Sequence, residues 1–307
     1  MRVVKGNPTT IEQDGFRFPL LVSYAYLRKA TEKTQDYILN HAKADGFEVL
    51  LDCGAFSAAN AGHEITLDEY MGFLHKHKDS FFAYIALDKL KDPVQTEINL
   101  KEMYAAGLDP CPVHTLGDDE KRMDELFELS DLVFLGGLRR PGRGAAPKPY
   151  VAQKMAWAKG RHAHWLGYTN IDMIKTFTPY SCDCSSWSGA QRWGQCDIYV
   201  GKGRWLPFER KGRLASLPPK VLWHIQNLGY NEQDWRTDDN WRMTNGQIFM
   251  TMDIMTDSWL RYIMDVRRSF GTRIFLACTI VSQQMEAIRK HWDRMKTEEK
   301  QRAADTR

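Results

Sequence analysis

The sequence has no apolar stretch that approaches the roughly 20 residues a membrane-spanning helix requires. Its first residues, MRVVKGNPTT, lack the apolar core of a signal peptide. These two absences argue against membrane and secreted proteins, and we expect a cytoplasmic protein with no membrane partner.

Two further absences narrow the class of protein. The six cysteines show no repeated framework, so we expect free thiols in a reducing compartment rather than disulfides. Neither a GxGxxG motif nor a P-loop motif occurs, which removes the main support for an open, nucleotide-binding sheet.

Apolar, β-rich runs alternate with helix-like segments along the chain. The runs occupy residues 18–27, 47–56, 81–88, 110–116, 132–138, 162–168 and 176–184. Between them, residues 66–77 begin with a threonine cap, and residues 93–107 begin with proline and end at glycine. Seven or eight strands alternating with helices predict an α/β fold with a parallel sheet. The number of such units favours a closed (β/α)8 TIM barrel with a C-terminal helical extension over an open, doubly wound sheet.

The C-terminal third is less regular. We expect the barrel to occupy residues 1–250, with a basic, tryptophan-rich insertion near 185–245, and residues 251–307 to form helices and a charged tail. Residues 253–268 have the pattern of an amphipathic helix and residues 282–300 that of a highly charged one. The tryptophans of this third are more often core residues than base-stacking residues.

Charge is unevenly distributed although the net charge is only +3. Residues 117–131 hold seven acids, whereas residues 132–171 hold seven Lys or Arg and no acid, and residues 192–213 are basic and rich in aromatics. Such stretches suit a phosphate backbone with an unstacked base, although a solvated surface over core tryptophans gives the same pattern. The candidate nucleic-acid-binding residues are Arg139, Arg140, Arg143, Lys148, Arg192, Lys202 and Arg204.

Polar residues follow several predicted strands. Asp52 ends the run in VLLDCGAFS, Asp88 ends the next, His114 lies at a third strand end, and Asp183 lies in PYSCDCSSW. In a barrel these strand ends converge on the active-site mouth. The alternative is that each aspartate caps the helix that follows it. Alternation along the strand directs Asp183 into the barrel if its two flanking cysteines face the helices.

The motifs DCGAF, ALD, FLGGL and HWLGYTNIDMI, leading into SCDC, occur in that order over about residues 18–190. This order resembles the tRNA-guanine transglycosylase superfamily, whose members show DSGGF, LD, GGL, a Leu/Met-Gly step and DCxxPTR. The chain is most similar to the DpdA-type branch, which inserts 7-deazaguanine bases into DNA in phages and bacterial defence clusters, where the modification is anti-restriction. The resemblance implies a pentosyltransferase, with DNA and a 7-deazaguanine base such as preQ0 as partners and no required cofactor.

The resemblance implies two catalytic aspartates. Asp183 matches the nucleophile that attacks C1′ of the nucleotide and holds the strand as a covalent glycosyl-enzyme. Asp52 matches the general acid/base that assists departure of guanine and then deprotonates the incoming base. Base exchange with retention at C1′ requires two displacements, so a pair of carboxylates with different environments suits this chemistry.

The resemblance also implies a base-binding set. Phe56 matches the aromatic side chain that stacks on the base, and Asp88 matches the carboxylate that binds its N1–H and 2-amino edge. The small-residue segment of Gly136, Gly137 and Leu138 matches backbone positions that contact the polar groups of the base.

Several positions depart from the family pattern. The glutamine that follows DSGGF is here Ser57, and the base-binding glutamine of the tRNA enzymes has His114 as its nearest counterpart. His114 either contacts the base or is a buried histidine bonded at a strand end. SSW replaces the PTR that follows the nucleophile. This change favours DNA over tRNA as the substrate.

The zinc cluster of the tRNA enzymes has no counterpart after residue 184. A four-ligand zinc site remains an option, although its spacing is irregular and buried cysteines also serve as small packing residues. Its ligands would be Cys182, Cys184, Cys196 and His224. We predict no metal site.

Three other functions fit part of the pattern. A transglycosylase acting on RNA would use the same carboxylates, and a two-carboxylate N-glycosidase acting on a small nucleoside would explain the aspartates alone. A non-catalytic DNA-binding barrel would explain only the basic stretches. Base exchange into DNA accounts for both features.

Overall fold

The computed structural model describes residues 17–44, 46–90, 92–140, 144–188, 194–241, 250–278 and 281–305. The chain divides into two compact units. Among the described residues, unit 1 comprises Arg17–Cys184 and Thr272–Val281, and unit 2 comprises Ser185–Gly271 and the segment from Ser282 onward.

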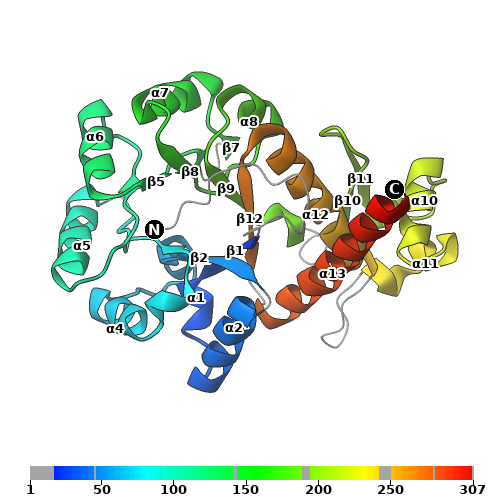
Figure 1. Cartoon of the computed structure of the whole chain (residues 1–307), viewed down its shortest axis with the longest axis horizontal. Helices are drawn as coiled ribbons and strands as arrows, with labels where there is room; N and C mark the ends of the chain where they lie inside the picture. The colour runs from blue at the N-terminus through cyan, green and yellow to red at the C-terminus, as the bar shows by residue number, and fades with distance from the viewer. Residues whose placement is uncertain are drawn as a thin grey trace. The chain divides into compact units, whose positions relative to one another are not determined.

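Unit 1 contains an eight-stranded sheet in which every neighbouring pair of strands is parallel. In chain order its strands are β1 (Phe18–Ser23), β2 (Phe47–Asp52), β3 (Ala83–Tyr84), β4 (Val113–His114), β5 (Leu132–Leu135), β8 (His162–Trp165), β9 (Ser181–Cys184) and β12 (Arg273–Cys278). Their order across the sheet is β3-β2-β1-β12-β9-β8-β5-β4. The sheet is curled, as in a TIM-like barrel (Figure 1).

β3 and β4, the two strands at the ends of this order, are followed or preceded by residues that contact one another. Ile85 forms a parallel bridge with Cys111. The backbone N–H of Cys111 donates to the carbonyl of Tyr84 at 2.8 Å, and the N–H of Ala86 donates to the carbonyl of Cys111 at 2.9 Å.

Helices flank the sheet on its outer side, as α4 to α8 show in Figure 1. The helices of unit 1 are α1 (Tyr24–Leu27), α2 (Glu32–Ala44), α3 (Ala55–Asn60), α4 (Leu67–His77), α5 (Pro93–Ala105), α6 (Glu120–Leu129), α7 (Lys148–Ala158) and α8 (Ile171–Phe177), with a short 3-10 turn, η1 (Lys78–Ser80). Thr66 caps α4 by accepting the N–H of Glu69, and proline starts α5 behind an Asp92 cap. Both helices begin where the sequence predicts.

Alternate residues of the strands form an apolar core inside the sheet. Its buried members are Leu21, Leu50, Ala83, Ile85, Cys111, Val113, Leu132, Phe134 and Phe275. Two residues beyond Leu21 and Leu50 along their strands come Ser23 and Asp52, which therefore point to the same face. The core thus continues into a polar layer at the carboxyl ends of the strands.

The strand β12 corrects the predicted domain boundary. Residues 251–307 were expected to hold only helices and a tail, yet RIFLAC in this segment forms the strand between β1 and β9. Five of its six residues are buried, as in a parallel strand with both faces covered. It therefore lacks the polar alternation that marks a half-exposed strand, and the barrel-like unit extends past residue 250.

Unit 2 is built from a hairpin, short helices and two long helices. Its elements are η2 (Ser186–Ser188), β10 (Gln195–Tyr199), β11 (Trp205–Glu209), η3 (Arg210–Gly212), α10 (Pro219–Asn227), α11 (Glu232–Arg236), η4 (Asp238–Trp241), α12 (Met250–Phe270) and α13 (Val281–Asp305). The two predicted C-terminal helices fall within α12 and α13. None of the helices in the described ranges is long and apolar enough to cross a membrane.

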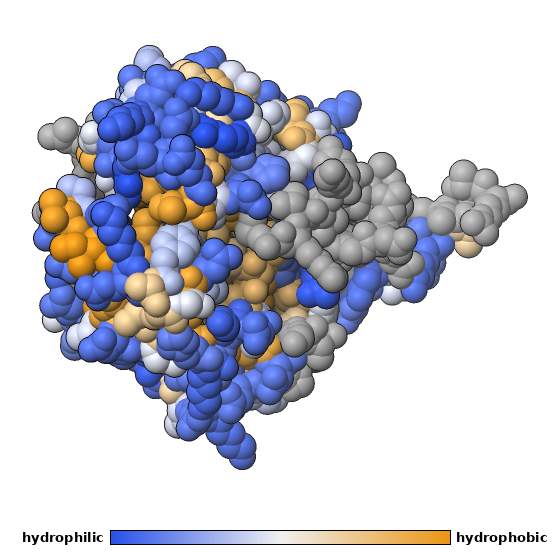
Figure 2. Space-filling view, turned by 60° about the vertical axis from the view of Figure 1, so that its left-hand side comes forward, coloured by the Kyte–Doolittle hydropathy of each residue, from blue (hydrophilic) through white to orange (hydrophobic). Residues whose placement is uncertain are grey.

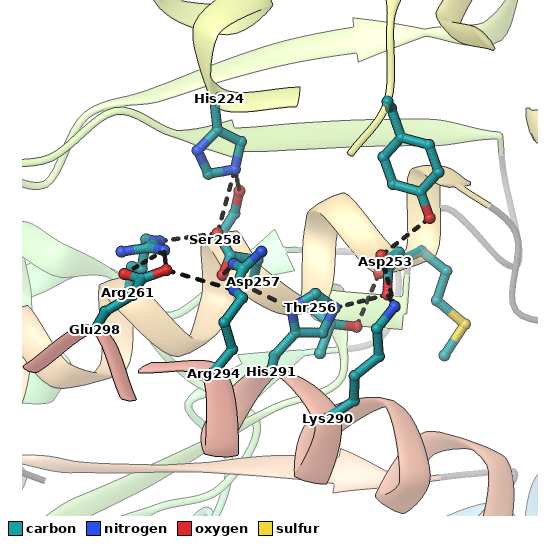
Figure 3. A network of polar contacts seen from close by, with 12 residues as sticks. His224, Asp253, Thr256, Asp257, Ser258, Arg261, Lys290, His291, Arg294 and Glu298 are labelled. Atoms are coloured by element: carbon teal, nitrogen blue, oxygen red, sulfur yellow. Dashed lines mark hydrogen bonds and ion pairs between the residues drawn. The ribbon is translucent and has the colours of Figure 1, made fainter. Parts of the chain in front are cut away.

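A buried polar network joins α12 to α13 (Figure 3). Asp253 of α12 accepts a hydrogen bond from His291 Nε2 at 2.6 Å, lies 3.2 Å from Lys290 Nζ, and accepts the hydroxyl of Tyr230 at 3.0 Å. Burial raises the pKa of Asp253, but His291 and Lys290 outweigh it and lower the pKa to about 2.

One turn along α12, Asp257 is fully buried and contacts four cationic or basic side chains, of which His291 has its Nδ1 3.7 Å from the carboxylate. Arg261 Nε lies 2.8 Å and His224 Nε2 lies 3.4 Å from its carboxylate, and Arg294 forms an ion pair with it. The polar side of this predicted amphipathic helix therefore faces α13 and α10 rather than solvent. Burying paired carboxylates in this way makes removal of one partner costly.

Candidate active site

Asp52 is the last residue of β2 and lies beside Ser23, the last residue of β1, in the sheet register. Its Oδ2 accepts the backbone N–H of Gly54 at 3.1 Å. Gly54 has a positive φ of 81°, and an added Cβ there would lie 2.6 Å from the backbone nitrogen of Ala25. Glycine is therefore required at this tight turn, which turns the Asp52 carboxylate back onto its own loop.

The electrostatic environment of Asp52 is unusual for an aspartate. The pKa of Asp52 is raised to about 6, chiefly by burial and also by the charges of Asp183 and Asp88, while the adjacent Ser23 hydroxyl and the Gly54 N–H oppose this rise. The structure therefore places Asp52 within electrostatic reach of both Asp88 and Asp183. A carboxyl group that titrates near neutral pH can both donate and accept a proton under physiological conditions.

Asp183 lies on β9, opposite Phe275 of the apolar core in the register with β12. It therefore faces the interior of the sheet, while Cys182 and Cys184 point the other way, as the alternation predicts. Its Oδ1 accepts the backbone N–H of Gly167 at 2.7 Å and lies 3.2 Å from Nε2 of His164. The side chain is 8% exposed, so these contacts fix the position of its carboxylate.

His164 is a site residue that sequence reasoning missed. It lies on β8, paired with Ser181 of β9, and its ring is fully buried 4.4 Å from that of Phe134. Its Nδ1 lies 2.8 Å from the hydroxyl of Ser181. The signal in the sequence was the HAHW alternation, which places this histidine on the same face as core residue Phe134.

Asp88 follows β3 and is partly buried. Its Oδ1 accepts a hydrogen bond from Thr96 Oγ1 at 2.9 Å. Burial raises its pKa, the Thr96 hydrogen bond opposes that change, and the charge of Asp118 adds to it.

The structure does not support the helix-capping alternative for these aspartates. The N-cap of α3 is Gly54, which makes no side-chain cap, and the N-cap of α5 is Asp92 rather than Asp88. The partners of Asp183 lie on β8 and in the loop that follows it, not in the segment after β9. Neither Asp52 nor Asp88 is therefore the N-cap of the helix that follows its strand.

Exposed apolar side chains follow the same strand ends. Phe56 in α3 and Leu116 after β4 are each 57% exposed, and Leu90 after β3 is 37% exposed. The face of the molecule in Figure 2 is mostly hydrophilic, with apolar side chains gathered in separate patches. Phe56 is thus accessible to a ligand, as base stacking requires.

The glycine pair after β5 is closely surrounded. An added Cβ at Gly137, whose φ is 73°, would lie 3.1 Å from both Leu116 Cβ and Tyr150 Oη. The N–H of Gly136 donates to the carbonyl of His114 at 2.9 Å, and Leu138 is fully buried.

The geometry of His114 supports the structural alternative rather than base contact. The ring is fully buried, with Nε2 2.9 Å from the carbonyl of Asp119 and Nδ1 2.9 Å from Nζ of Lys154. Lys154 is itself 2% exposed and also donates to the carbonyls of Thr115 and Asp118. Burial lowers its pKa to about 8. All three N–H groups of this lysine are used to hold the loop after β4.

The basic stretch at 132–171 is partly neutralised in space. Lys159 and Arg161 both bind Asp124 of α6, at 2.8 and 2.5 Å, so the acidic stretch neutralises part of the basic one. Lys148, at the start of α7, is exposed. The hairpin of β6 (Arg139–Arg140) and β7 (Gly144–Ala145) is present, but the side chains of its two arginines, and all of Arg143 and Arg192, lie outside the described residues.

The hairpin of β10 and β11 carries the other basic candidates. Lys202 and Arg204 are exposed at its turn, and no ion pair within the described ranges joins either to an acid. In contrast, Arg210 and Arg213 both bind Asp238, with Arg210 Nε 2.8 Å from its carboxylate.

Most tryptophans of unit 2 belong to its core. Trp187, Trp235 and Trp241 are at most 1% exposed, and the rings of the last two form an edge contact at 4.7 Å. Trp223 is 64% exposed. The prediction that these tryptophans are core residues is therefore confirmed for the three buried ones, whereas Trp223 is accessible.

The described residues form no cluster of three or more His, Cys, Asp or Glu side chains suited to a metal ion. Of the four residues considered for zinc, His224 contacts Ser258 and Asp257, and Cys196 Sγ lies 3.8 Å from the carbonyl of Thr251. Comparison with protein-family models and with curated proteins gives no match.

Proposed function

We propose that this protein is a transglycosylase that exchanges guanine in DNA for a 7-deazaguanine base through a covalent glycosyl-aspartate intermediate. One observation carries the proposal: two carboxylates at the same end of the sheet, Asp52 and Asp183, interact electrostatically yet have different environments. Retaining exchange at a sugar carbon requires such a division of roles.

The first displacement forms the intermediate. Oδ2 of Asp183 attacks C1′, the bond from C1′ to the base nitrogen breaks, and its electron pair leaves with guanine. Asp52, whose pKa of about 6 keeps a protonated fraction at neutral pH, supplies the proton that neutralises the departing base.

The second displacement reverses these roles. Asp52, now ionised, takes the proton from the incoming base, whose nitrogen attacks C1′ and displaces the Asp183 carboxylate. The carboxylates are regenerated in their starting forms. Because every step uses only these two groups, the proposed reaction requires no cofactor.

The base-binding roles follow the family resemblance and the accessible surface. Phe56 is exposed and can stack on a flipped base, and Asp88 can accept hydrogen bonds from the N1–H and 2-amino groups. The backbone at 136–138 lies after β5, where the positive φ of Gly137 and its close neighbours disfavour a larger residue. We assign no base contact to His114.

The proposed polymer is DNA, which the protein contacts through exposed basic residues. Lys202, Arg204 and Lys148 are the described candidates, and the arginines of the β6–β7 hairpin complete the set. We further propose that the curled sheet of unit 1 is a closed (β/α)8 barrel, with the Ile85–Cys111 bridge as its closing contact.

Covalent trapping tests this function directly. Wild-type protein incubated with guanine-containing DNA should give a protein–DNA adduct that withstands denaturing electrophoresis and disappears when free base is added. Asp183→Asn should give none, whereas Asp172→Asn, which changes an exposed aspartate of α8, should behave as wild type. An adduct that persists in Asp183→Asn would exclude Asp183 as the nucleophile.

A further inference from the structure

A linear array of three side chains crosses from β9 to β8 and back. Ser181 Oγ lies 2.8 Å from Nδ1 of His164, and Nε2 of His164 lies 3.2 Å from Oδ1 of Asp183. Ser181 and His164 are fully buried, and only Asp183, two residues nearer the carboxyl end of β9, has any exposure. The accessible end of the array is therefore the carboxylate, which rules out Ser181 as a nucleophile.

The contacts define the protonation of the array. Burial lowers the pKa of His164, with Asp183 opposing that change, so the neutral imidazole is the favoured form. A neutral ring that donates to Asp183 carries its proton on Nε2, and its Nδ1 must then accept from the hydroxyl of Ser181. Ser181 therefore selects the tautomer that can donate to Asp183.

The two hydrogen-bond donors of Asp183 bind the same carboxylate oxygen. The N–H of Gly167 and Nε2 of His164 bind Oδ1, and no hydrogen bond to Oδ2 is made by the described residues. Two donors on one oxygen leave the other with its lone pairs available to an electrophile.

We infer that His164 is a positioning residue that, with the Gly167 N–H, orients the Asp183 carboxylate so that Oδ2 is the atom that attacks C1′. This inference rests on the proposed function and adds to it a residue that the family resemblance does not assign. The array also rigidifies the nucleophile, because a carboxylate held by two donors cannot rotate between its two oxygens.

The test compares three variants with a matched control by single-turnover adduct formation on DNA. His164→Phe keeps an aromatic ring beside Phe134 but removes the donor, and should slow adduct formation by about 10- to 100-fold, the scale of one hydrogen bond to a charged group. His164→Gln, whose amide nitrogen can take the place of Nε2, should recover most of that loss. Ser181→Ala should slow adduct formation by roughly several-fold, because the hydroxyl that selects the Nε2–H tautomer of His164 is gone.

The control is His162→Phe, two residues earlier on β8, where the centroid of the histidine ring lies 4.2 Å from that of Tyr180 and the ring does not contact Asp183. It should form adduct within about twofold of wild type. For folded His164→Phe, affinity for DNA should match that of the control, so that the loss appears in the rate of adduct formation and not in binding. Unchanged adduct formation in folded His164→Phe, or an equal loss in the control, would overturn the inference.

A second readout separates this inference from the proposed function. Nitrogen-15 NMR of histidine-labelled protein should show His164 as the Nε2–H tautomer, with a mixed tautomer in Ser181→Ala. An Nδ1–H tautomer in wild type would overturn the array whether or not the protein is active. If the tautomer is as expected but wild type forms no adduct with DNA, the array stands and the transglycosylase assignment fails.

Discussion

Replacing Asp52 by asparagine should make the protein more stable while removing its proton shuttle. The pKa of Asp52 rises from 3.8 to about 6 in the folded chain, chiefly because burial disfavours the ionised form. The folded state therefore binds the proton more tightly than the unfolded state. The stabilisation that protonated Asp52 contributes is complete below about pH 4 and is lost as the pH rises through about 6.

The size of the effect follows from the shift. Each pKa unit corresponds to about 1.4 kcal/mol, so ionised Asp52 costs at most about 3 kcal/mol above pH 7, and partial exposure lowers that bound. Asp52→Asn removes the charge but keeps an acceptor for the Gly54 N–H. We expect a gain in unfolding free energy of roughly 1–3 kcal/mol at pH 8 that shrinks toward zero at pH 4.

The assay is urea unfolding of both proteins from pH 4 to 8, with hydrogen exchange of β2 peptides to report on unit 1. Comparing the two proteins at each pH removes the titration of groups they share, such as His164. Asp79→Asn, at an exposed carboxylate in η1, is the control and should show no gain. The gain should also be smaller in an Asp183→Asn background, because the charge of Asp183 helps to raise the pKa of Asp52. Loss of stability on Asp52→Asn at pH 8, or an equal gain in both backgrounds, would refute the conclusion that Asp52 and Asp183 share one site.

Three other predictions concern rate, DNA binding and unit 2. Single-turnover adduct formation should fall about tenfold per pH unit above pH 6, because guanine departure needs protonated Asp52, whereas capture by the incoming base should rise through about pH 6 to a plateau at higher pH. Replacing Lys202 and Arg204 by alanine should flatten the slope of log K against log salt for DNA by roughly one unit per lost phosphate contact, whereas Lys211→Ala, already paired with Glu209, should change it little. The stability contributed by Asp253 should be present above about pH 4 and lost toward pH 2, so Asp253→Asn should cost about 2 kcal/mol at pH 7 by urea unfolding and weaken the acid dependence.

The sequence predicted the features that depend on local pattern. The seven apolar runs each contain a strand, the Thr66 and Pro93 signals start helices, and the period-two alternation gives the direction of Asp183. Each of these follows from spacing within one segment, which a single sequence displays.

The features that it did not predict depend on contacts between distant segments. The strand β12 is buried on both faces, so its run carries no alternation to distinguish it from a helix core. His164 becomes a site residue only because β8 pairs with β9 in a register that places it beside Ser181. The pairing of Lys159 and Arg161 with Asp124 likewise joins residues 35 or more positions apart, which a charge count along the chain does not reveal.

Incorporation of labelled base into DNA tests the central claim most directly. Guanine-containing DNA and tRNA are incubated separately with wild-type protein and radiolabelled guanine or 7-cyano-7-deazaguanine, and label in the polymer is counted. We predict label in DNA with wild type, none with Asp183→Asn, and little in tRNA. Label that enters tRNA but not DNA, or enters DNA equally with Asp183→Asn, would contradict the account.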